Sequence, residues 1–239
     1  GARAMSGPTG PIEPTGPDDR DGRDGRTGHR DAVLKFFYGP MDCGKSTLAL
    51  QMHHNQARQG RSGLVLTRYD RSASPRITTR VGLTHDAIEV MDDMDLRALV
   101  REHWARGQRV DYLIVDEAGF LSAGHVDQLA ELVDTQHVDV FCFGLITDFR
   151  SQLFDGARRL VELADEIAPV HVEVLCWCGR AGRQNARVVD GRVVREGDTV
   201  VVADTARDAP VRYQVLCRRH FLAGALGPDS PGPGQLRLG

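Results

Sequence analysis

Apolar and polar residues alternate along the first half of the chain in blocks that predict strands and helices in turn. Short β-rich runs end in glycine or acidic residues, and longer segments with helical spacing separate them. The predicted strands cover residues 32–38, 62–68, 110–117 and 138–145, and the predicted helices cover residues 45–60, 92–107 and 123–136. Strands that alternate with helices in this way are typical of an α/β fold, with a mainly parallel sheet between helices on both faces.

The pattern changes near residue 169, where short valine-rich strands and turns replace the helices. The predicted strands lie within residues 171–179, 184–198, 199–204 and 211–220. Asp190-Gly191, between two valine-rich runs, is a strong signal for a two-residue hairpin. We therefore predict that residues 32–169 form the α/β domain and residues 170–222 form a small β-rich appendage.

Both ends of the chain have a composition that disfavours a packed core. Residues 1–31 are rich in Gly, Pro, Asp and Arg, and residues 223–239 include the run "GPDSPGPGQLRLG". Such segments bury too little apolar surface to offset the entropy of ordering them. We expect both to be disordered.

The net charge and the apolar runs of the chain argue against two classes of partner, nucleic acids and membranes. The 239 residues carry a formal net charge of -3, with a pI near 6.3. This charge gives no general electrostatic basis for binding nucleic acid or an anionic membrane. No apolar run approaches the roughly 20 residues that cross a bilayer, and the first residues lack the apolar core of a secretory signal. We expect a cytoplasmic protein with no membrane or nucleic-acid partner.

The stretch "GPMDCGKST" at residues 39–47 fits the phosphate-loop motif. Gly39 and Gly44 allow the backbone to curl round an anion so that successive N–H groups point inward. The predicted helix begins near Lys45, and the positive end of its dipole faces the same anion. Lys45 is expected to reach the outer phosphates, and the Ser46 hydroxyl to bind Mg²⁺. The strand before and the helix after supply the context that this motif requires.

A second acidic motif, "YLIVDE" at residues 112–117, ends another predicted core strand. Asp116 is placed to hold the shell of Mg²⁺, as in phosphate-loop NTPases generally. Glu117 follows and is a candidate proton acceptor. A glutamate here can activate either water or an alcohol, so these two residues leave the acceptor of the phosphate open.

Three cysteines and a histidine form a candidate metal site in the appendage. Cys176 and Cys178 are followed, after 38 intervening residues, by Cys217 and His220. Four ligands of this kind suit tetrahedral Zn²⁺, and a site closed by four protein ligands is structural. Metal binding would supply folding energy to a module with little core of its own.

Three aromatic residues are candidates for stacking on a flat ring. Phe149 follows the strand 138–145, and ligands of open α/β sheets bind at the carboxyl ends of the strands. Spacing alone favours a core position as much as a stacking role for Phe149, and the same holds for Phe120 and Tyr213.

These residues leave more than one function open. A phosphate-loop kinase acting on a small molecule fits the motifs. A RecA-like ATPase with a zinc ribbon that binds nucleic acid also fits them, and Arg218-Arg219 beside the predicted zinc site favours it slightly. The net charge disfavours this second reading, which DNA-stimulated ATP hydrolysis would identify.

Taken together, the motifs resemble the type II thymidine kinases of bacteria and animal cytosol. The resemblance runs from about Leu34 to His220 and rests on "YGPMDCGKST", "LIVDEAGFL", "FGLITDFRSQLF", "CWCGR", "VRYQVLC" and "CRRH", in the order and spacing of the family. It implies a RecA-like domain with a zinc-bearing lasso domain that closes over the nucleoside. It also implies ATP-dependent phosphorylation of the 5′-hydroxyl of thymidine, and of deoxyuridine, to the monophosphate. This reaction salvages deoxynucleotides for DNA synthesis, and the implied oligomer is a homotetramer.

The resemblance also assigns roles residue by residue. Glu117 is the implied catalytic base for the thymidine 5′-hydroxyl, and Ser46 and Asp116 are the implied Mg²⁺ ligands. The implied ATP-binding residues are Gly39, Pro40, Met41, Asp42, Cys43, Gly44, Lys45, Ser46, Asp116, Glu117, Ala118 and Gly119. The implied thymidine-binding residues are Met41, Phe120, Leu145, Phe149, Val201, Val202, Ala203, Asp204, Thr205 and Tyr213.

The chain departs from the family pattern at three places. Gly119 stands where the family usually has Gln or a similar residue. Ala203-Asp204 replaces a frequent Gly-Gly pair in the lasso, and "ARDAP" lengthens the segment before Tyr213. The last two departures affect the expected contacts of the lasso and leave the phosphate motifs intact.

Overall fold

A sheet of six parallel strands occupies the centre of the chain. The computed structural model describes residues 31–69, 75–198 and 211–227. In spatial order the strands are β5 (Ile88–Glu89), β2 (Gly63–Thr67), β6 (Tyr112–Val115), β7 (Asp139–Gly144), β1 (Leu34–Tyr38) and β8 (Glu166–Pro169). Every residue of β6 and β7 is buried. Burial on both faces explains why these strands are continuous apolar runs rather than alternating ones.

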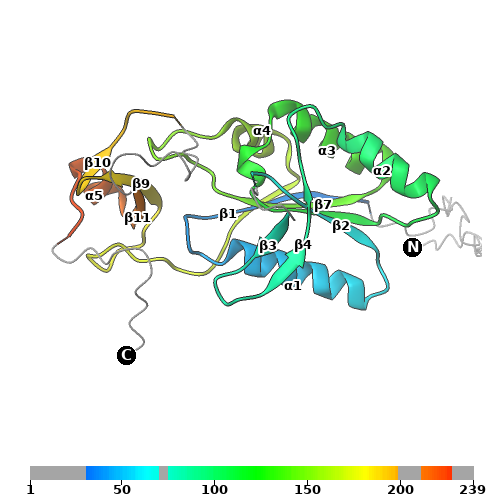
Figure 1. Cartoon of the computed structure of the whole chain (residues 1–239), viewed down its shortest axis with the longest axis horizontal. Coiled ribbons are helices and arrows are strands. Elements are labelled where there is room, and N and C mark those ends of the chain that lie inside the picture. Colours follow the sequence, from blue (N-terminus) through cyan, green and yellow to red (C-terminus); the bar gives the residue numbers. More distant parts are fainter. Residues whose placement is uncertain (1–30, 70–74, 199–210, 228–239) are drawn as a thin grey trace, which may run out of the picture. The chain divides into compact units, whose positions relative to one another are not determined.

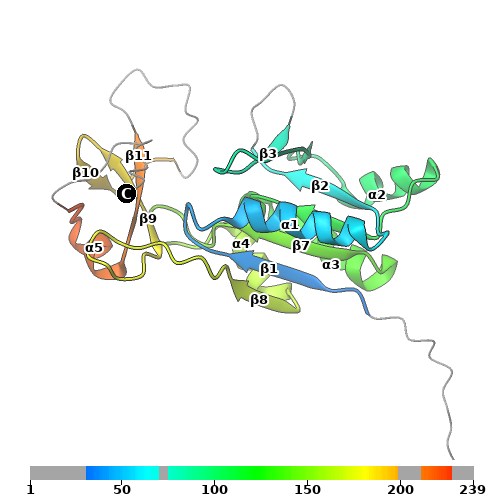
Figure 2. The same ribbon diagram turned by 90° about the horizontal axis from the view of Figure 1, so that it is seen from below.

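Helices cover both faces of this sheet, as the sequence predicts (Figures 1 and 2). The helix α1 (Lys45–Arg58) packs on one face, where Ala49 joins a cluster with Phe141 and Phe143. The other face carries α2 (Leu96–Ala105), α3 (Ala123–Gln136) and α4 (Asp155–Leu163). Side chains from these helices form the larger apolar cluster. The α/β class is confirmed.

Two of the predicted helices begin directly after a polar side chain that caps them. The helix α3 spans the predicted residues, and the Ser122 hydroxyl caps it by accepting the His125 N–H at 3.1 Å. The helix α2 begins later than predicted because Asp95 caps it, accepting the N–H groups of Arg97 and Ala98. Neither α4 nor β8 was predicted from the sequence.

A short antiparallel hairpin lies beside α1 and was also not predicted. It consists of β3 (Arg76–Thr78) and β4 (Thr84–Asp86). Ile77 anchors it, because this side chain is buried in the apolar cluster that contains Ala49 of α1. Two loop bonds hold its tip, with Thr79 N–H donating to Leu83 O and Gly82 N–H donating to Thr79 O. The tip of the hairpin therefore extends from two strands that Ile77 anchors against α1.

A second sheet of three antiparallel strands follows, in the order β10 (Arg192–Val194), β9 (Gln184–Val189) and β11 (Arg212–Leu216). The predicted hairpin at Asp190-Gly191 is confirmed. Both residues have positive φ, 49° and 71°, as the two central positions of a type I′ turn require.

Two predicted strands of this region are wrong in part. Residues 171–179 form no strand beyond a single bridge between Leu175 and Ala181, because the chain turns tightly there and Cys176 N–H donates to Arg180 O. The strand predicted over 211–220 ends at Leu216, and α5 (Arg218–Ala223) follows it. The predicted strand at 199–204 lies outside the described residues. Across the described ranges, no helix has the length and apolar character needed to cross a membrane.

Candidate active site

The phosphate loop connects β1 to α1, as the sequence predicts. Gly44 has φ +79° and precedes the first residue of the helix. Gly39 leaves no room for a side chain, because a Cβ there would lie 2.4 Å from the sulfur of Cys43, which is fully buried. Asp42 also has positive φ, at 67°. The backbone of the loop therefore follows a tight turn, with Gly39 packed against the side chain of Cys43.

Lys45, at the start of α1, turns back onto the loop. Its Nζ donates hydrogen bonds to Pro40 O at 2.7 Å and to Gly39 O at 3.3 Å. The side chain is buried and lies in the wall of the cavity described below. Any anion that this amine binds must compete with these two carbonyls.

The acidic motif places Asp116 and Glu117 after β6, at the same edge of the sheet as the loop. The Ser46 hydroxyl donates to Asp116 Oδ2 at 2.7 Å, and Asp116 Oδ1 accepts the Glu117 N–H at 3.0 Å. Asp116 is buried, and burial raises its pKa, although the bond from Ser46 acts in the opposite direction. The hydrogen bond between Ser46 and Asp116 therefore joins the two predicted Mg²⁺ ligands.

Glu117 has a strained backbone and a strongly perturbed carboxyl group. Its φ is +55°, a conformation that non-glycine residues adopt at a cost and that recurs at functional sites. It precedes the short 3₁₀ helix η1 (Ala118–Phe120). Burial, followed by the charge of Asp116, raises the pKa of Glu117 to about 7, while Lys45 acts to lower it. The side chain is half-buried, because one side of it faces a cavity.

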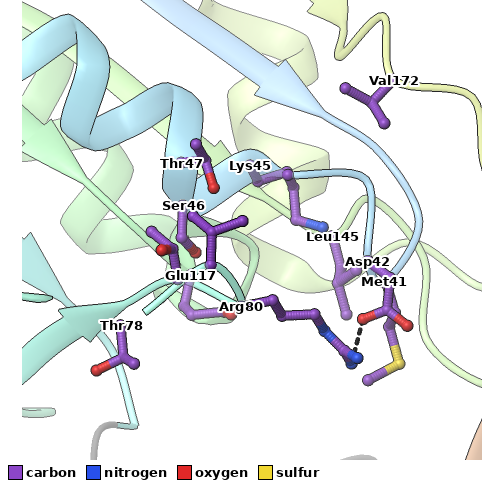
Figure 3. Close-up of a pocket in the computed structure, with 13 residues that line it drawn as sticks. Met41, Asp42, Lys45, Ser46, Thr47, Thr78, Arg80, Glu117, Leu145 and Val172 are labelled. Atoms are coloured by element: carbon purple, nitrogen blue, oxygen red, sulfur yellow. Dashed lines mark ion pairs between the residues drawn. The ribbon is translucent and has the colours of Figure 1, made fainter. Parts of the chain in front are cut away.

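This cavity, of about 350 Å³, brings many of the predicted residues together. Figure 3 shows Glu117, Ser46 and Lys45 on its wall, with the loop residues Met41 and Asp42 nearby. Among the described residues, the lining consists of Met41, Asp42, Gly44, Lys45, Ser46, Thr47, Thr78, Thr79, Arg80, Val81, Glu117, Leu145 and Val172. A cation, a hydroxyl group and a carboxyl group with a pKa near neutrality therefore face one space at the carboxyl ends of β1 and β6.

Several predicted ATP-binding residues lie beside this cavity rather than on its wall. Gly39 and Pro40 line a neighbouring cavity of about 530 Å³. Cys43, Asp116 and Ala118 are buried behind the wall. Gly119 is also buried, and a Cβ there would lie 2.3 Å from the backbone oxygen of Leu145. This close approach gives a physical reason why glycine stands at this position.

The predicted thymidine-binding residues are more scattered. Met41 and Leu145 line the cavity. Phe120 is half-buried and packs edge-on against Phe154, with ring centroids 4.7 Å apart, at the border of the larger apolar cluster. Residues 201–205 lie outside the described part of the chain.

Phe149 and Tyr213 both contact Arg187, a residue that no sequence motif identifies. The guanidinium carbon of Arg187 lies 3.6 Å from the centroid of the buried Phe149 ring. Its Nε donates to the Tyr213 hydroxyl at 3.1 Å, and its Nη2 donates to Asp198 O at 2.7 Å. Arg187 therefore covers one face of Phe149, and a flat ligand would have to stack on the other face or displace this side chain.

The four predicted zinc ligands come together as expected. Their ligand atoms all lie within 4.8 Å of one another. Cys178 Sγ is 3.9 Å from Cys217 Sγ, and His220 Nδ1 is 3.4 Å from Cys176 Sγ and 3.6 Å from Cys217 Sγ. Tetrahedral Zn²⁺ with ordinary bond lengths separates two sulfurs by about 3.8 Å and a sulfur from a nitrogen by about 3.6 Å. The donor set and its spacing fit this metal.

The elements around the cluster explain this arrangement. Cys217 and His220 lie three residues apart at the start of α5, so one helical turn directs both towards Cys176 and Cys178. The Trp177 ring stacks on His220 with centroids 4.2 Å apart, and its Nε1 donates to Ala225 O at 3.0 Å. The histidine is therefore held in place by an aromatic neighbour.

Comparison with known proteins identifies relatives that match most of this chain. The family model "Thymidine kinase" matches residues 32–221. A thymidine kinase of Cutibacterium acnes is 51% identical over 199 residues, which are 83% of this chain and 92% of that protein. A thymidine kinase of Streptomyces coelicolor is 51% identical over 206 residues (82% and 95%), and that of the phage T4 is 35% identical over 194 residues (80% and 95%). The chain therefore belongs to the thymidine kinase family.

Proposed function

We propose that this chain transfers the γ-phosphoryl group of ATP to the 5′-hydroxyl of thymidine, and also of deoxyuridine. The single observation that carries the proposal is the convergence of Lys45, the Ser46–Asp116 pair and Glu117 on one cavity. Phosphoryl transfer depends mainly on alignment and on stabilisation of charge, and this set supplies both. The match to the thymidine kinase family supports thymidine as the acceptor.

The phosphate loop would hold ATP through its backbone N–H groups, with Lys45 moving from its loop carbonyls to the outer phosphates. The 2.7 Å between Ser46 Oγ and Asp116 Oδ2 is close to the roughly 2.9 Å between neighbouring ligands of octahedral Mg²⁺. Ser46 and Asp116 would therefore hold this ion, which neutralises phosphate charge when bound. The other predicted ATP-binding residues would form the walls and the backing of this site.

Glu117 would orient the 5′-hydroxyl and accept its proton. A carboxyl group with a pKa of about 7 is well suited to a base that works near neutral pH. In the transfer, the bond from the γ-phosphorus to the bridging oxygen of ATP breaks, and a bond from the same phosphorus to the 5′ oxygen forms. The proton of the hydroxyl group passes to Glu117, and ADP leaves with the bridging oxygen.

The base would bind between the two sheets, with the lasso domain excluding water so that transfer is favoured over hydrolysis. Two contacts support this role for the lasso. The Met41 N–H of the phosphate loop donates to Asn185 Oδ1 of β9 at 2.8 Å, and Arg187 of β9 covers Phe149. Phe149 and Tyr213 would flank the thymine ring, and residues 201–205 would bind its edge through backbone groups.

A zinc ion at the four-residue cluster would hold the lasso together, with no part in the chemistry. The division into domains at 32–169 and 170–222, the homotetramer and the cytoplasmic location remain predictions. All three are proposed in agreement with the resemblance to type II thymidine kinases.

A product assay tests the proposal. The full chain is incubated with Mg·ATP and each deoxynucleoside separately, and in parallel with single-stranded DNA. We expect a 5′-monophosphate from thymidine and deoxyuridine in step with ADP. ADP formation only in the presence of DNA, with no phosphorylated nucleoside, would contradict the proposal and indicate an ATPase.

A further inference from the structure

Arg80 faces the phosphate loop from an element that no motif identifies. It lies at the tip of the β3–β4 hairpin, and it lines the same cavity as Lys45, Ser46 and Glu117. Figure 3 shows its side chain extending across the cavity towards Asp42. The base of the hairpin is anchored by Ile77, so the fold directs this arginine at the loop from the opposite wall.

The charges on the cavity wall make a second cation significant. Within the part of the chain that the structure describes, Lys45 and Arg80 are the cations on the cavity wall, and Asp42 and Glu117 are the acids. A third carboxyl group, that of Asp116, is buried and accepts the Glu117 N–H. One lysine is a small positive charge for a site that must accept a triphosphate beside three carboxyl groups.

The present partner of Arg80 is Asp42 of the phosphate loop, with which it forms an ion pair. The Arg80 side chain is 75% exposed and that of Asp42 is 43% exposed. Ion pairs between exposed side chains are weak, so phosphate oxygens can replace this carboxylate at little cost. A guanidinium also presents several N–H donors in a plane, a geometry that matches phosphate oxygens better than an ammonium does.

We propose that Arg80 is a catalytic residue that leaves Asp42 and binds the transferring phosphoryl group. The inference rests on the proposed function, because it assigns a role in that transfer. Negative charge spreads over the equatorial oxygens of the phosphoryl group in the transition state, and an arginine positioned there stabilises it. Arg80 forms and breaks no covalent bond, and the proton of the 5′-hydroxyl still passes to Glu117.

Three variants of the full chain test this role in the thymidine assay with Mg·ATP. We expect Arg80→Ala to lower kcat by at least about 100-fold, with the KM for thymidine within about threefold of the wild type. Arg80→Lys should recover no more than about a tenth of the lost rate, because an ammonium lacks the planar donors. Arg76→Ala is the matched control, because Arg76 lies on the same hairpin, pairs with Asp86 and is not part of the cavity wall. Its kcat should stay within about twofold.

A second measurement separates this role from a structural one. The exposed Arg80 side chain contributes little to folding, so the Tm of Arg80→Ala should match that of Arg76→Ala. Asp42→Asn should raise kcat more in the wild-type background than in the Arg80→Ala background, because Asp42 competes for Arg80 only when Arg80 is present.

The outcomes distinguish the two proposals. A wild-type chain that forms no thymidine monophosphate would overturn both. An active wild type together with an Arg80→Ala variant whose kcat stays within threefold would overturn this inference alone. A rise in the KM for ATP with unchanged kcat would also overturn it, because Arg80 would then bind the ground state and the transition state equally.

Discussion

Replacing Glu117 by glutamine should stabilise the folded chain above pH 7 while it removes most of the turnover. Burial and the neighbouring Asp116 raise the pKa of Glu117 from its ordinary value of 4.5 to about 7. Ionisation is therefore less favourable in the folded state than in the unfolded state. Glutamine has nearly the same shape and carries no charge, so it avoids this penalty.

The direction of the pH dependence follows from this pKa. Below pH 4.5 the carboxyl group is protonated in both states, and it brings no electrostatic penalty. Between pH 4.5 and about 7 the unfolded chain loses this proton first, so this group's contribution to stability falls as pH rises. Above pH 7 the penalty is complete. The advantage of Glu117→Gln should therefore be small at pH 5 and full at pH 8.

The rise in pKa sets an upper limit of about 3 kcal/mol on the penalty. Because one side of Glu117 faces the open cavity, solvent reduces this value, and we expect about 1–3 kcal/mol. For a chain of this size, 1 kcal/mol changes the Tm by about 2–4 °C. The Tm of Glu117→Gln should exceed that of the wild type by about 3–10 °C at pH 8.

Calorimetry of the full chain at pH 5 and pH 8 measures this difference. Mg²⁺ and nucleotides are left out, because they bind the folded state and change its Tm. Glu102→Gln, at an exposed acid on α2, is the matched control and should change stability by less than about 0.5 kcal/mol. An equal Tm difference at both pH values, or none at pH 8, would refute the reasoning about the buried carboxyl group.

Three further predictions concern the other parts of the site. The kcat/KM of the wild type should rise with pH up to about 7 and then level off, because Glu117 must lose its proton to act as base; a flat pH–rate profile would contradict this. Cys217→Ser should lose most of its zinc and raise the KM for thymidine, whereas Cys142→Ala, outside the cluster, should keep its zinc. Elemental analysis measures the zinc content of both purified variants, and the kinase assay measures the KM. Gly119→Ala should destabilise the fold by about 1–3 kcal/mol in urea unfolding, because the added Cβ meets the backbone oxygen of Leu145, and an unchanged midpoint would show that the backbone shifts freely.

The parts of the site that could be predicted from the sequence are local in the chain. The phosphate loop lies within nine consecutive residues, and Asp116 and Glu117 directly follow an apolar strand. Because the carboxyl ends of parallel strands meet at one edge of a sheet, the alternation of strands and helices was enough to place these groups together. The metal cluster could be predicted for a similar reason, since the chemistry of three cysteines and a histidine is specific whatever fold joins them.

Other features depended on tertiary packing, because they join residues that no spacing rule connects. Arg80 reaches Asp42 from a hairpin whose position depends on the burial of Ile77 against α1. Arg187 is one of many arginines in the sequence, and only the pairing of β9 with β11 and the contact with Phe149 distinguish it. The sequence alone determined the loop, the acids and the metal ligands, since their chemistry depends on neighbours in the chain. Only the folded structure decided which distant cations face them, because that depends on how side chains pack across elements.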